Sequence, residues 1–450
     1  MNKNSSSRGH FSSSLGFIFA SAGAAIGLGN LWKFPYVAGS SGGGLFVIFY
    51  LLFTLILGIP ILITEISIGR KTKLNPIGAY KALDKKWTFV GAIAVIAAFL
   101  VLSYYSVVGG WVLKYFFSYL SGEQITGGDT SFFKQFIAQP VEPVVWHLIF
   151  MAVTAFIVIG GVSKGIESVS KFMLPGLLIL IIVIAIRSLT LDGALAGVSF
   201  FLKPNPDQIS TFRGTTSVMA TALGQVFFSL SVGTGISITY GSYVKKNSNI
   251  SKNSFIIAGL DLLIAILAGF AILPAVFALG LEPTAGPGLI FEILPEVFEG
   301  FPAGRVFGVV FFILVFFAAV TSAISMLEVV TSYFIDNFGF KRRNATILLA
   351  SAMALVGTFA SLSFGKLSNF TIMDKSLFDF LGFLTDKILM PFTGIMTCIF
   401  IGHRYKVARL AEEIAEGTKN GKMKFQKTFN FLISWVAPTM ILFIFITELV

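Results

Sequence analysis

Long apolar stretches separated by short polar segments make up most of this chain. Each stretch has the length and composition that an α-helix needs to cross the hydrocarbon core of a bilayer, which takes about 20 residues. The pattern predicts an all-α polytopic membrane protein with about eleven transmembrane helices. The expected spans are 15–38, 43–69, 88–120, 144–161, 167–190, 213–241, 254–281, 304–335, 344–363, 377–402 and 429–449.

The first apolar stretch contains residues that weaken a helix near its middle. Gly23, Gly27 and Gly29 lower helix propensity, and Pro35 is expected to disrupt the helix further on. In hydrocarbon a broken helix leaves N–H and C=O groups unpaired, which is tolerated where the backbone lines a cavity or binds a ligand. We therefore expect a binding site near mid-membrane in this span.

The sixth apolar stretch has small, helix-weakening residues at the corresponding place, between Gln225 and Gly235. Interrupted segments at matching positions of two halves are typical of secondary transporters, and they predict a 5+5 inverted repeat with broken helices 1 and 6. The alternative, that the glycines only allow close helix packing, explains one such span better than two in register. The expected divisions are a cytoplasmic segment 1–14, repeats 15–190 and 213–402, a cytoplasmic connector 403–428 and a last span 429–450.

Broken helices and nearby hydroxyls offer two kinds of ligand. Half-helix N-termini favour a carboxylate, and unwound carbonyls favour a cation. In the eighth stretch, Thr321 and Ser322 add two hydroxyl oxygens, which suit a small hard cation such as Na⁺. Alternatively, both hydroxyls bond to carbonyls one turn back, as is common in membrane helices.

Composition and charge support a membrane protein. Of 450 residues, 55% are hydrophobic and 12% are charged, which excludes an ordinary soluble protein. The net charge of +11 comes from basic residues in alternate loops, so the positive-inside rule places the N-terminus in the cytoplasm. An odd number of spans then places Val450 outside. We expect contact with lipid headgroups rather than nucleic acid.

Enzyme and channel functions are less consistent with the sequence. No polar region is long enough for a soluble catalytic domain, and the HExxH pattern is absent. His10, His147 and His403 fall near predicted membrane boundaries, away from acid clusters. A channel needs a continuous polar path, whereas these polar interruptions are short and flanked by aromatic residues. The lone Cys398 cannot form an internal disulfide.

Several motifs resemble the neurotransmitter:sodium symporter family, especially its bacterial amino-acid members. The resemblance covers nearly the whole chain. It implies uptake of a small amino acid with sodium by alternating access, in the inner membrane of a bacterium. The motifs are GLGNLWKFPY at 27–36, GIPILITEISIGR at 58–70, Tyr104-Tyr105 with Trp111, SKGIE at 163–167, GQVFFSLSVGTG at 224–235 and FFAAVTSAISMLE at 316–328.

The resemblance implies two sodium sites. The first would use Ala25, Asn30, Ser229 and Asp261. The second would use Gly23, Ile26, Ala318, Thr321 and Ser322. In animal relatives chloride balances the sodium charge, and Asp261 could supply a fixed negative charge instead, so we expect that chloride is not required. A structural acid paired elsewhere is the alternative.

The resemblance also implies a substrate pocket without a charged side chain, which favours a neutral hydrophobic or aromatic amino acid. Gly27 stands where monoamine transporters carry an aspartate, so the substrate must bring its own carboxylate. Tyr105 and Phe228 would cover the substrate. The expected contacts are Ala25, Gly27, Leu28, Gly29, Val101, Tyr105, Phe228, Ser229, Ser231, Thr234, Ser322 and Met326.

Gate residues are expected on both sides of the pocket. Lys33 replaces the arginine of the family's outer gate, with Asp379 as its expected partner. Arg8 and Asp336 resemble the inner gate pair. Glu65 is expected to anchor the backbone of a broken helix by hydrogen bonds.

Several alternatives stay open at this point. A non-transporting amino-acid sensor of the same fold would bind substrate without accumulating it. Proton antiport through Asp261 or Glu328 is conceivable, and the sequence leaves sodium stoichiometry, the particular amino acid and oligomeric state undetermined.

Overall fold

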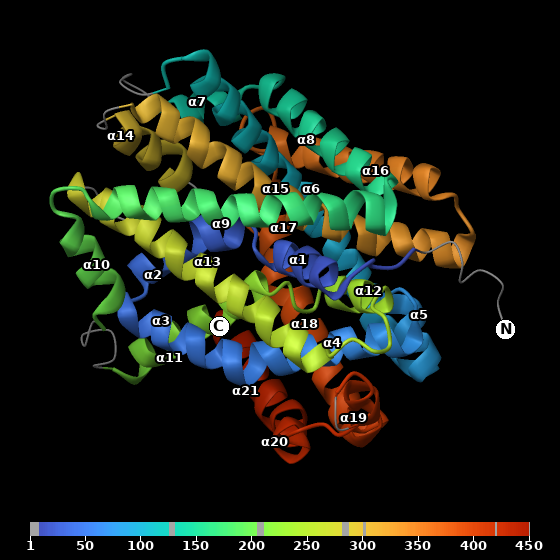
Figure 1. Cartoon of the computed structure of the whole chain (residues 1–450). Helices are drawn as coiled ribbons and strands as arrows, with labels where there is room; N and C mark the ends of the chain where they lie inside the picture. Colours follow the sequence, from blue (N-terminus) through green and yellow to red (C-terminus); the bar gives the residue numbers. More distant parts are fainter. Residues whose placement is uncertain are drawn as a thin grey trace.

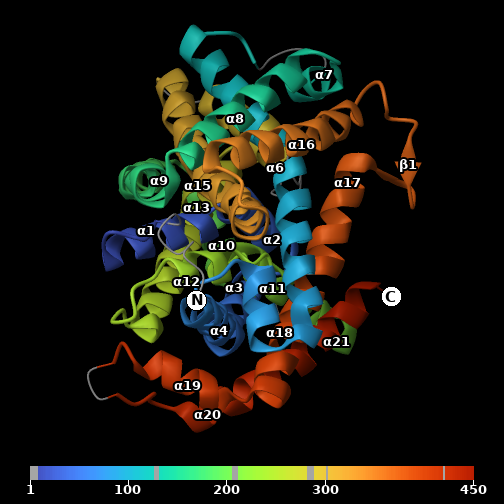
Figure 2. The same ribbon diagram turned by 90° about the vertical axis from the view of Figure 1, so that its right-hand side faces the viewer.

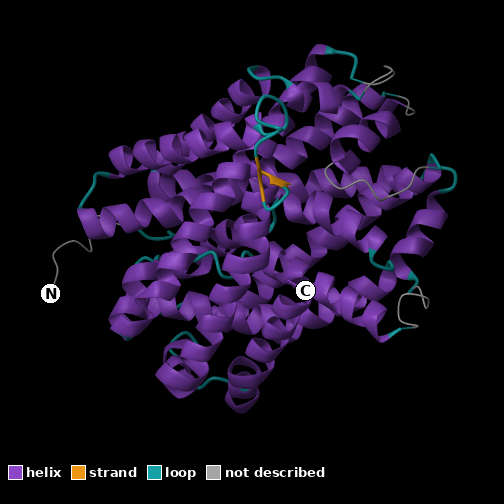
Figure 3. Cartoon of the chain, turned by 180° about the vertical axis from the view of Figure 1, so that it is seen from behind, coloured by secondary structure: helices purple, strands orange, loops and turns teal. Residues whose placement is uncertain are grey.

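Helices account for nearly all of the described structure (Figures 1 and 3). The computed structural model describes residues 9–125, 131–204, 211–280, 288–299, 303–418 and 421–449. Within these residues, eight helices are long and apolar enough to cross a membrane, or nine if the two bent pieces of the first span count as one. The all-α class is thus confirmed, while the total of eleven spans stays a prediction.

The longest helices follow the expected spans closely. Two of them, α6 and α15, pack along one another through the middle of the molecule (Figure 1). Single helices are α6 (Thr88–Ser121), α8 (Glu142–Ile159), α13 (Ile250–Ala278), α15 (Gly304–Phe338) and α16 (Arg342–Leu362). Spans that include π-helical turns contain α3 (Gly44–Phe53) with α4 (Ile59–Thr72), α9 (Ser168–Leu189), and α17 (Leu377–Gly382) with α18 (Met390–Ile399).

The first span is broken as predicted, but its break lies before Pro35. Helix α1 (Ser14–Ala25) and the Gly29–Ser40 piece, which ends in α2 (Phe34–Ser40), meet at an angle of 61°. Pro35 does not interrupt this piece, because it lies in the first turn of α2, where a missing N–H costs least. Helix α1 contacts α9, α13 and α15, so its broken end lies in the molecular interior.

The sixth span is also broken, between α11 (Phe212–Ser229) and α12 (Ile236–Ser242). Gly233 and Gly235 have φ of +85° and +75°, a region that glycine adopts without strain. Glu65 on α4 accepts a hydrogen bond from the Gly233 N–H at 3.0 Å. This bond satisfies an unwound backbone group and confirms the anchoring role expected for Glu65.

Short elements outside the long apolar stretches complete the fold. A hairpin of two residues per strand pairs Thr371 with Ser376 (Figure 3). The segment between α13 and α15 contains a small helix, although 281–287 and 300–302 lie outside the described residues. The short elements are α5 (Pro76–Leu83), α7 (Phe132–Ala138), α10 (Ala194–Leu202), α14 (Leu294–Glu299), β1 (Thr371–Ile372), β2 (Lys375–Ser376), α19 (Val407–Ala415), α20 (Gln426–Phe431) and α21 (Ala437–Leu449).

The connector after α18 lies at the edge of the bundle. Figures 1 and 2 both place α19 and α20 outside the central helices, with α21 returning toward them. Helix α19 packs against α4 through a buried ion pair, Arg70 Nε to Glu413 Oε1 at 2.6 Å. The amphipathic connector expected for 403–428 is therefore held against the protein.

Candidate functional site

A buried hydrogen-bonded cluster lies where both broken spans meet α13. Asn30 Nδ2 donates to Asp261 Oδ1 at 2.7 Å, and Ser229 Oγ donates to the two carboxylate oxygens at 2.8 and 2.9 Å. Tyr50 on α3 donates to Asp261 Oδ2 at 3.2 Å. All four side chains are buried. Carboxylate, hydroxyl and amide oxygens are hard donors of the kind that suits Na⁺.

The break in the first span connects directly to this cluster. Ala25 is the last residue of α1 and is buried beside the break. The Gly27 N–H donates to Asn30 Oδ1 at 3.3 Å, so the Asn30 amide also satisfies the unwound backbone. The residues expected at the first sodium site therefore meet around Asp261, with Ala25 at the adjoining helix end.

The second expected sodium site lies between α15 and the end of α1. Ser322 Oγ donates to the carbonyls of Gly23 and Ala24 at 3.3 and 3.2 Å. Thr321 lies against Gly23 so closely that a Cβ added to the glycine would be 3.0 Å from Thr321 Cβ. The Ser322 hydroxyl thus faces carbonyls at the open end of α1, an arrangement of oxygen atoms suited to a hard cation.

The other residues expected at the second sodium site lie on the same two helices, α1 and α15. Thr321 Oγ1 donates to the Ala318 carbonyl at 3.1 Å, which is the bond within a helix considered as the alternative role. Ile26 is the residue that closes α1, and its N–H donates to the Ala22 carbonyl at 2.7 Å. Gly23, Thr321 and Ser322 therefore meet between α1 and α15, while Ile26 lies at the end of α1 and Ala318 lies on α15 one turn before Thr321.

A small cavity of about 30 Å³ lies beside these groups and is lined mainly by the residues expected to bind substrate. Leu28 and Ser229 do not line it, because Leu28 donates its N–H to Tyr105 Oη at 3.1 Å and Ser229 faces Asp261. No charged side chain is among the described residues that line it. They are Ala24, Ala25, Gly27, Gly29, Val101, Tyr105, Phe228, Ser231, Thr234, Ser322, Met326 and Met390.

Two glycines at the break leave room for the side chains that surround the cavity. A Cβ at Gly27 would lie 2.7 Å from Ser322 Oγ and 3.0 Å from Tyr105 Oη. A Cβ at Gly29 would lie 2.4 Å from the Phe228 ring. These distances are shorter than any van der Waals contact, so glycine is required for the close approach of backbone and side chains.

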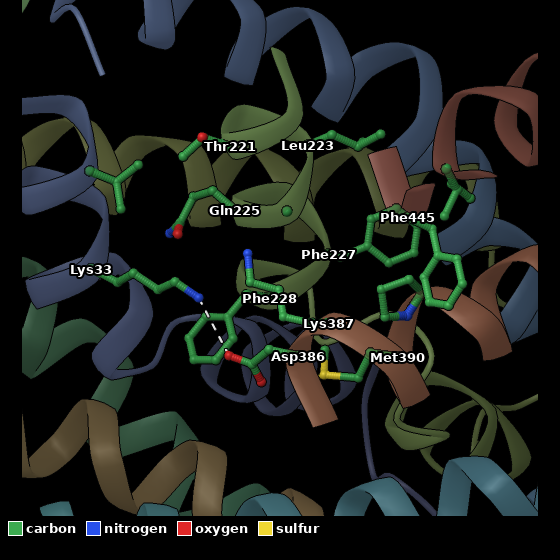
Figure 4. Close-up of a pocket in the computed structure, with 14 residues that line it drawn as sticks. Lys33, Thr221, Leu223, Gln225, Phe227, Phe228, Asp386, Lys387, Met390 and Phe445 are labelled. Carbon is green, nitrogen blue, oxygen red and sulfur yellow. Dashed lines mark hydrogen bonds and ion pairs between the residues drawn. The ribbon is translucent and has the colours of Figure 1, made fainter. Parts of the chain in front are cut away.

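A second cavity of about 110 Å³ lies on the other side of Phe228 (Figure 4). Lys33 Nζ lies 3.4 Å from Asp386 Oδ2, and it also lies 4.1 Å from the centre of the Phe228 ring. Tyr104 donates to the other carboxylate oxygen of Asp386 at 3.1 Å. Lys33 therefore contacts both Asp386 and the Phe228 ring, and this ring also lines the cavity of about 30 Å³.

Comparison with known proteins identifies the family of this chain. The profile of the Sodium:neurotransmitter symporter family matches residues 8–126 and 137–450. The chain belongs to this family. The symporter is therefore a multi-pass, sodium-dependent membrane transporter rather than an enzyme, as the motifs indicated.

Similar proteins align with the symporter over nearly its whole length. An uncharacterized sodium-dependent transporter of Bacillus subtilis, YhdH, is 40% identical over 441 residues, which are 97% of this chain and 96% of the relative. An uncharacterized sodium-dependent transporter of Haemophilus influenzae is 35% identical over the full length of both. The crystal structure of MhsT in complex with L-phenylalanine matches with a TM-score of 0.90 and 40% identity, over 98% of this chain and 99% of that one.

The outer ion pair of the symporter corrects one expectation. Lys33 pairs with Asp386 rather than with Asp379. Asp379 is exposed in the first turn of α17, where its N–H donates to Oγ of the N-cap residue Ser376 at 3.1 Å and its carboxylate accepts from the same hydroxyl at 2.6 Å. The prediction was wrong by about two helical turns. The span begins at Leu377, as hydropathy indicated, but the apolar pattern does not show which of its acids lies level with Lys33.

The opposite end of the symporter is closed by polar contacts between helices. Asp336, at the end of α15, accepts from Asn75 Nδ2 at 2.6 Å. Arg8, its expected partner, lies outside the described residues. Glu328 is bound by Arg342 and by Tyr243, each at 2.6 Å, so this carboxylate links α15 to α16 and to the end of α12.

Four residues of the site escaped the sequence reasoning, namely Ala24, Tyr50, Asp386 and Met390. Tyr50 belongs to an apolar stretch without a motif of its own, and only its hydroxyl distinguishes it from the neighbouring phenylalanines. Met390 follows Asp386 by four residues and thus lies on the same helix face. Recognising Asp386 as the gate acid would have identified Met390 as well.

Proposed function

We propose that this symporter takes up a neutral hydrophobic or aromatic amino acid together with sodium. The observation that carries the proposal is the cavity between the two broken spans, which adjoins both oxygen clusters and has no charged residue among its described lining residues. A charged side chain would be left unpaired there. MhsT, of similar fold, has been crystallised with L-phenylalanine, which agrees with this class of substrate.

Two sodium ions would bind in this scheme, one at each oxygen cluster. The first would be held by Ala25, Asn30, Ser229 and Asp261, and the amino-acid carboxylate would reach the same ion. Because the ion and the carboxylate share a site, each favours binding of the other by the same factor. An inward sodium gradient would then drive accumulation of the amino acid.

Chloride is not required in the proposed mechanism. The Asp261 carboxylate accepts hydrogen bonds from Asn30, Ser229 and Tyr50, so three donors stabilise a fixed negative charge inside the membrane. That charge would neutralise the first sodium ion, which is the task of chloride in animal relatives.

Alternating access would proceed by motion of the first, second, sixth and seventh spans against the others. On one side Lys33 and Asp386 close the path, and on the other Asp336 and Glu328 hold neighbouring helices together. The loops rich in basic residues support a cytoplasmic N-terminus and a Val450 that lies outside. The bacterial relatives support the inner membrane of a bacterium as the location.

Uptake into proteoliposomes tests the proposal. Labelled neutral amino acids are supplied with Na⁺ or K⁺ outside, and with chloride or gluconate as the anion. We expect concentrative uptake that requires Na⁺ and survives the removal of chloride. Uptake that fails without chloride would refute the role of Asp261. Sodium-dependent binding without accumulation would identify a sensor instead.

A further inference from the structure

A wide groove lies beside the connector, away from the transport path. It measures about 890 Å³ and runs between the end of the α18 span and the start of the last span. Its wall includes His403, Lys406, Phe425, Lys427 and Trp435. In both Figure 1 and Figure 2, α19 and α20 lie at the outer edge of the bundle.

The charge of this groove is positive. Lys406 and Lys427 are exposed and come from opposite walls, and no acidic residue is among the described residues that line the groove. The neighbouring Arg404 is already paired with Asp84, Nε to Oδ2 at 2.6 Å, and it is one of the contacts that lower the pKa of this carboxyl group, after the Lys86 N–H. The two lysines therefore present uncompensated charge within the groove.

Aromatic rings line the same groove and are unusually exposed. The side chains of Phe425 and Trp435 are 80% and 61% exposed. The Trp435 ring packs edge-on against His403, with centroids 5.0 Å apart, and His403 Nε2 lies 2.9 Å from the Ser434 carbonyl. Tryptophan with an apolar body and a polar N–H is favoured at the boundary between headgroups and acyl chains.

Two residues that line the groove have an unfavourable backbone conformation. Lys406 and Phe425 have φ of +80° and +59°, values that side chains with a Cβ seldom adopt. Both residues precede the helices that form the walls of the groove, α19 and α20. Such strained positions persist where the surrounding structure fixes them, and they concentrate at binding sites.

We propose that this groove binds an anionic phospholipid. Lys406 and Lys427 contact its phosphodiester, and Trp435 and Phe425 pack against the glycerol and the upper acyl chains. Basic pockets between helices at the cytoplasmic face are a recognised form of headgroup site. The groove lies beside α19 and α20 at the edge of the bundle, so a lipid can enter it without crossing the cavity between the broken spans.

Native mass spectrometry of the purified full-length protein tests this proposal. The protein in detergent receives equal amounts of phosphatidylglycerol and phosphatidylcholine. We expect preferential retention of phosphatidylglycerol by the wild type. In the double variant Lys406→Gln/Lys427→Gln, we expect that preference to fall by roughly tenfold or more, since each lysine near a lipid surface contributes about fivefold.

A matched double variant controls for the loss of net charge. Lys81→Gln/Lys85→Gln removes two exposed charges from the α5 region and is expected to bind lipid as the wild type does. If the Lys406 variant fails to fold, Lys427→Gln alone serves, with an expected loss of about fivefold. Trp435→Ala keeps both charges and is expected to weaken retention of both lipids.

Three outcomes would overturn the proposal. These are equal retention of the two lipids by the wild type, an unchanged preference in the Lys427→Gln variant, and equal losses in both double variants. Excess inorganic phosphate is a separate probe. We expect it to leave bound phosphatidylglycerol in place, and displacement would show that the groove recognises a free phosphate rather than a lipid.

Discussion

Asp261 is the residue whose surroundings most restrict the mechanism. Its carboxylate is completely buried and lies within 3.2 Å of donors from three different helical segments. An ionised group in such a place is stabilised only if these donors or a cation face it. The donors that surround Asp261 thus stabilise its negative charge at the place where we propose that the first sodium ion binds.

Replacement of this charge is expected to change ion binding. Asp261→Asn keeps the size of the side chain but removes the negative charge next to the proposed first sodium site. We expect the apparent sodium affinity to fall by about tenfold or more, as measured by sodium-dependent amino-acid binding. Uptake by the variant should also become sensitive to chloride. An unchanged sodium affinity would show that Asp261 is a structural acid.

Gly29 tests the geometry of the cavity. In Gly29→Ala the new methyl group would lie 2.4 Å from the Phe228 ring, so the ring must move into the cavity or the break must shift. We expect amino-acid binding to weaken by about fivefold or more, as overpacking typically costs about 1–3 kcal/mol. Gly259→Ala on α13 is the control, because nothing lies within 4 Å of its added Cβ. Equal binding by the two variants would contradict the close approach.

Among the elements, the long helices were predictable and their interruptions only partly so. The expected 88–120 and 304–335 spans correspond to α6 and α15 within three residues at each end. Hydropathy identifies these spans because lipid requires an apolar surface over a fixed length. The short helices α5 and α10 and the hairpin were not predicted, since no such length requirement applies outside the membrane.

The candidate site was predictable wherever a motif fixed the register. Asn30, Ser229, Thr321 and Ser322 all lie within motifs, and all meet at the broken ends of α1 and α11. The tenth span carries no motif. The apolar pattern predicted where this span begins and ends, but not which of Asp379 and Asp386 lies level with Lys33. Position along a helix axis needs such a marker, because hydropathy changes little from turn to turn.

The bond from Glu65 to the sixth break gives a prediction about element stability. Glu65→Ala leaves the Gly233 N–H without its partner in a buried place, which costs about 1–3 kcal/mol. Glu65→Gln retains an oxygen acceptor and should keep most of this stability. Thermal unfolding in detergent measures both. Ser67→Ala on the same helix is the control, since that hydroxyl bonds only to the Ile63 carbonyl. Equal melting of the Ala and Gln variants would contradict this role.

At the scale of the whole molecule, a single lysine joins the two sides of the outer path. Lys33 belongs to the first span, Asp386 to the tenth and Phe228 to the sixth. The ion pair is partly exposed, and such pairs contribute about 0.2–1 kcal/mol. The contact with the ring adds about 0.5–1 kcal/mol. Together they hold the outer path closed by a modest margin.

Lys33→Gln should therefore open the outer cavity more often. Thr221→Cys, in the wall of this cavity, reports the opening, because the natural Cys398 is buried and reacts slowly. We expect labelling of Thr221→Cys by a polar thiol reagent to be about fivefold or more faster when Lys33 is replaced. Lys366→Gln, an exposed charge elsewhere, should leave the rate unchanged. A rate that does not respond to Lys33→Gln would show that other contacts close the path.

Ser322 belongs to two parts of the molecule at once. Its hydroxyl bonds to the open carbonyls of α1, and the same residue lines the cavity in which we propose that the amino acid binds. A change at this position would alter substrate preference and ion coupling together, so evolution can seldom use it to acquire a new substrate. Diversification among related symporters should instead concentrate at Val101, Thr234 and Met326, which line the cavity and belong to neither oxygen cluster.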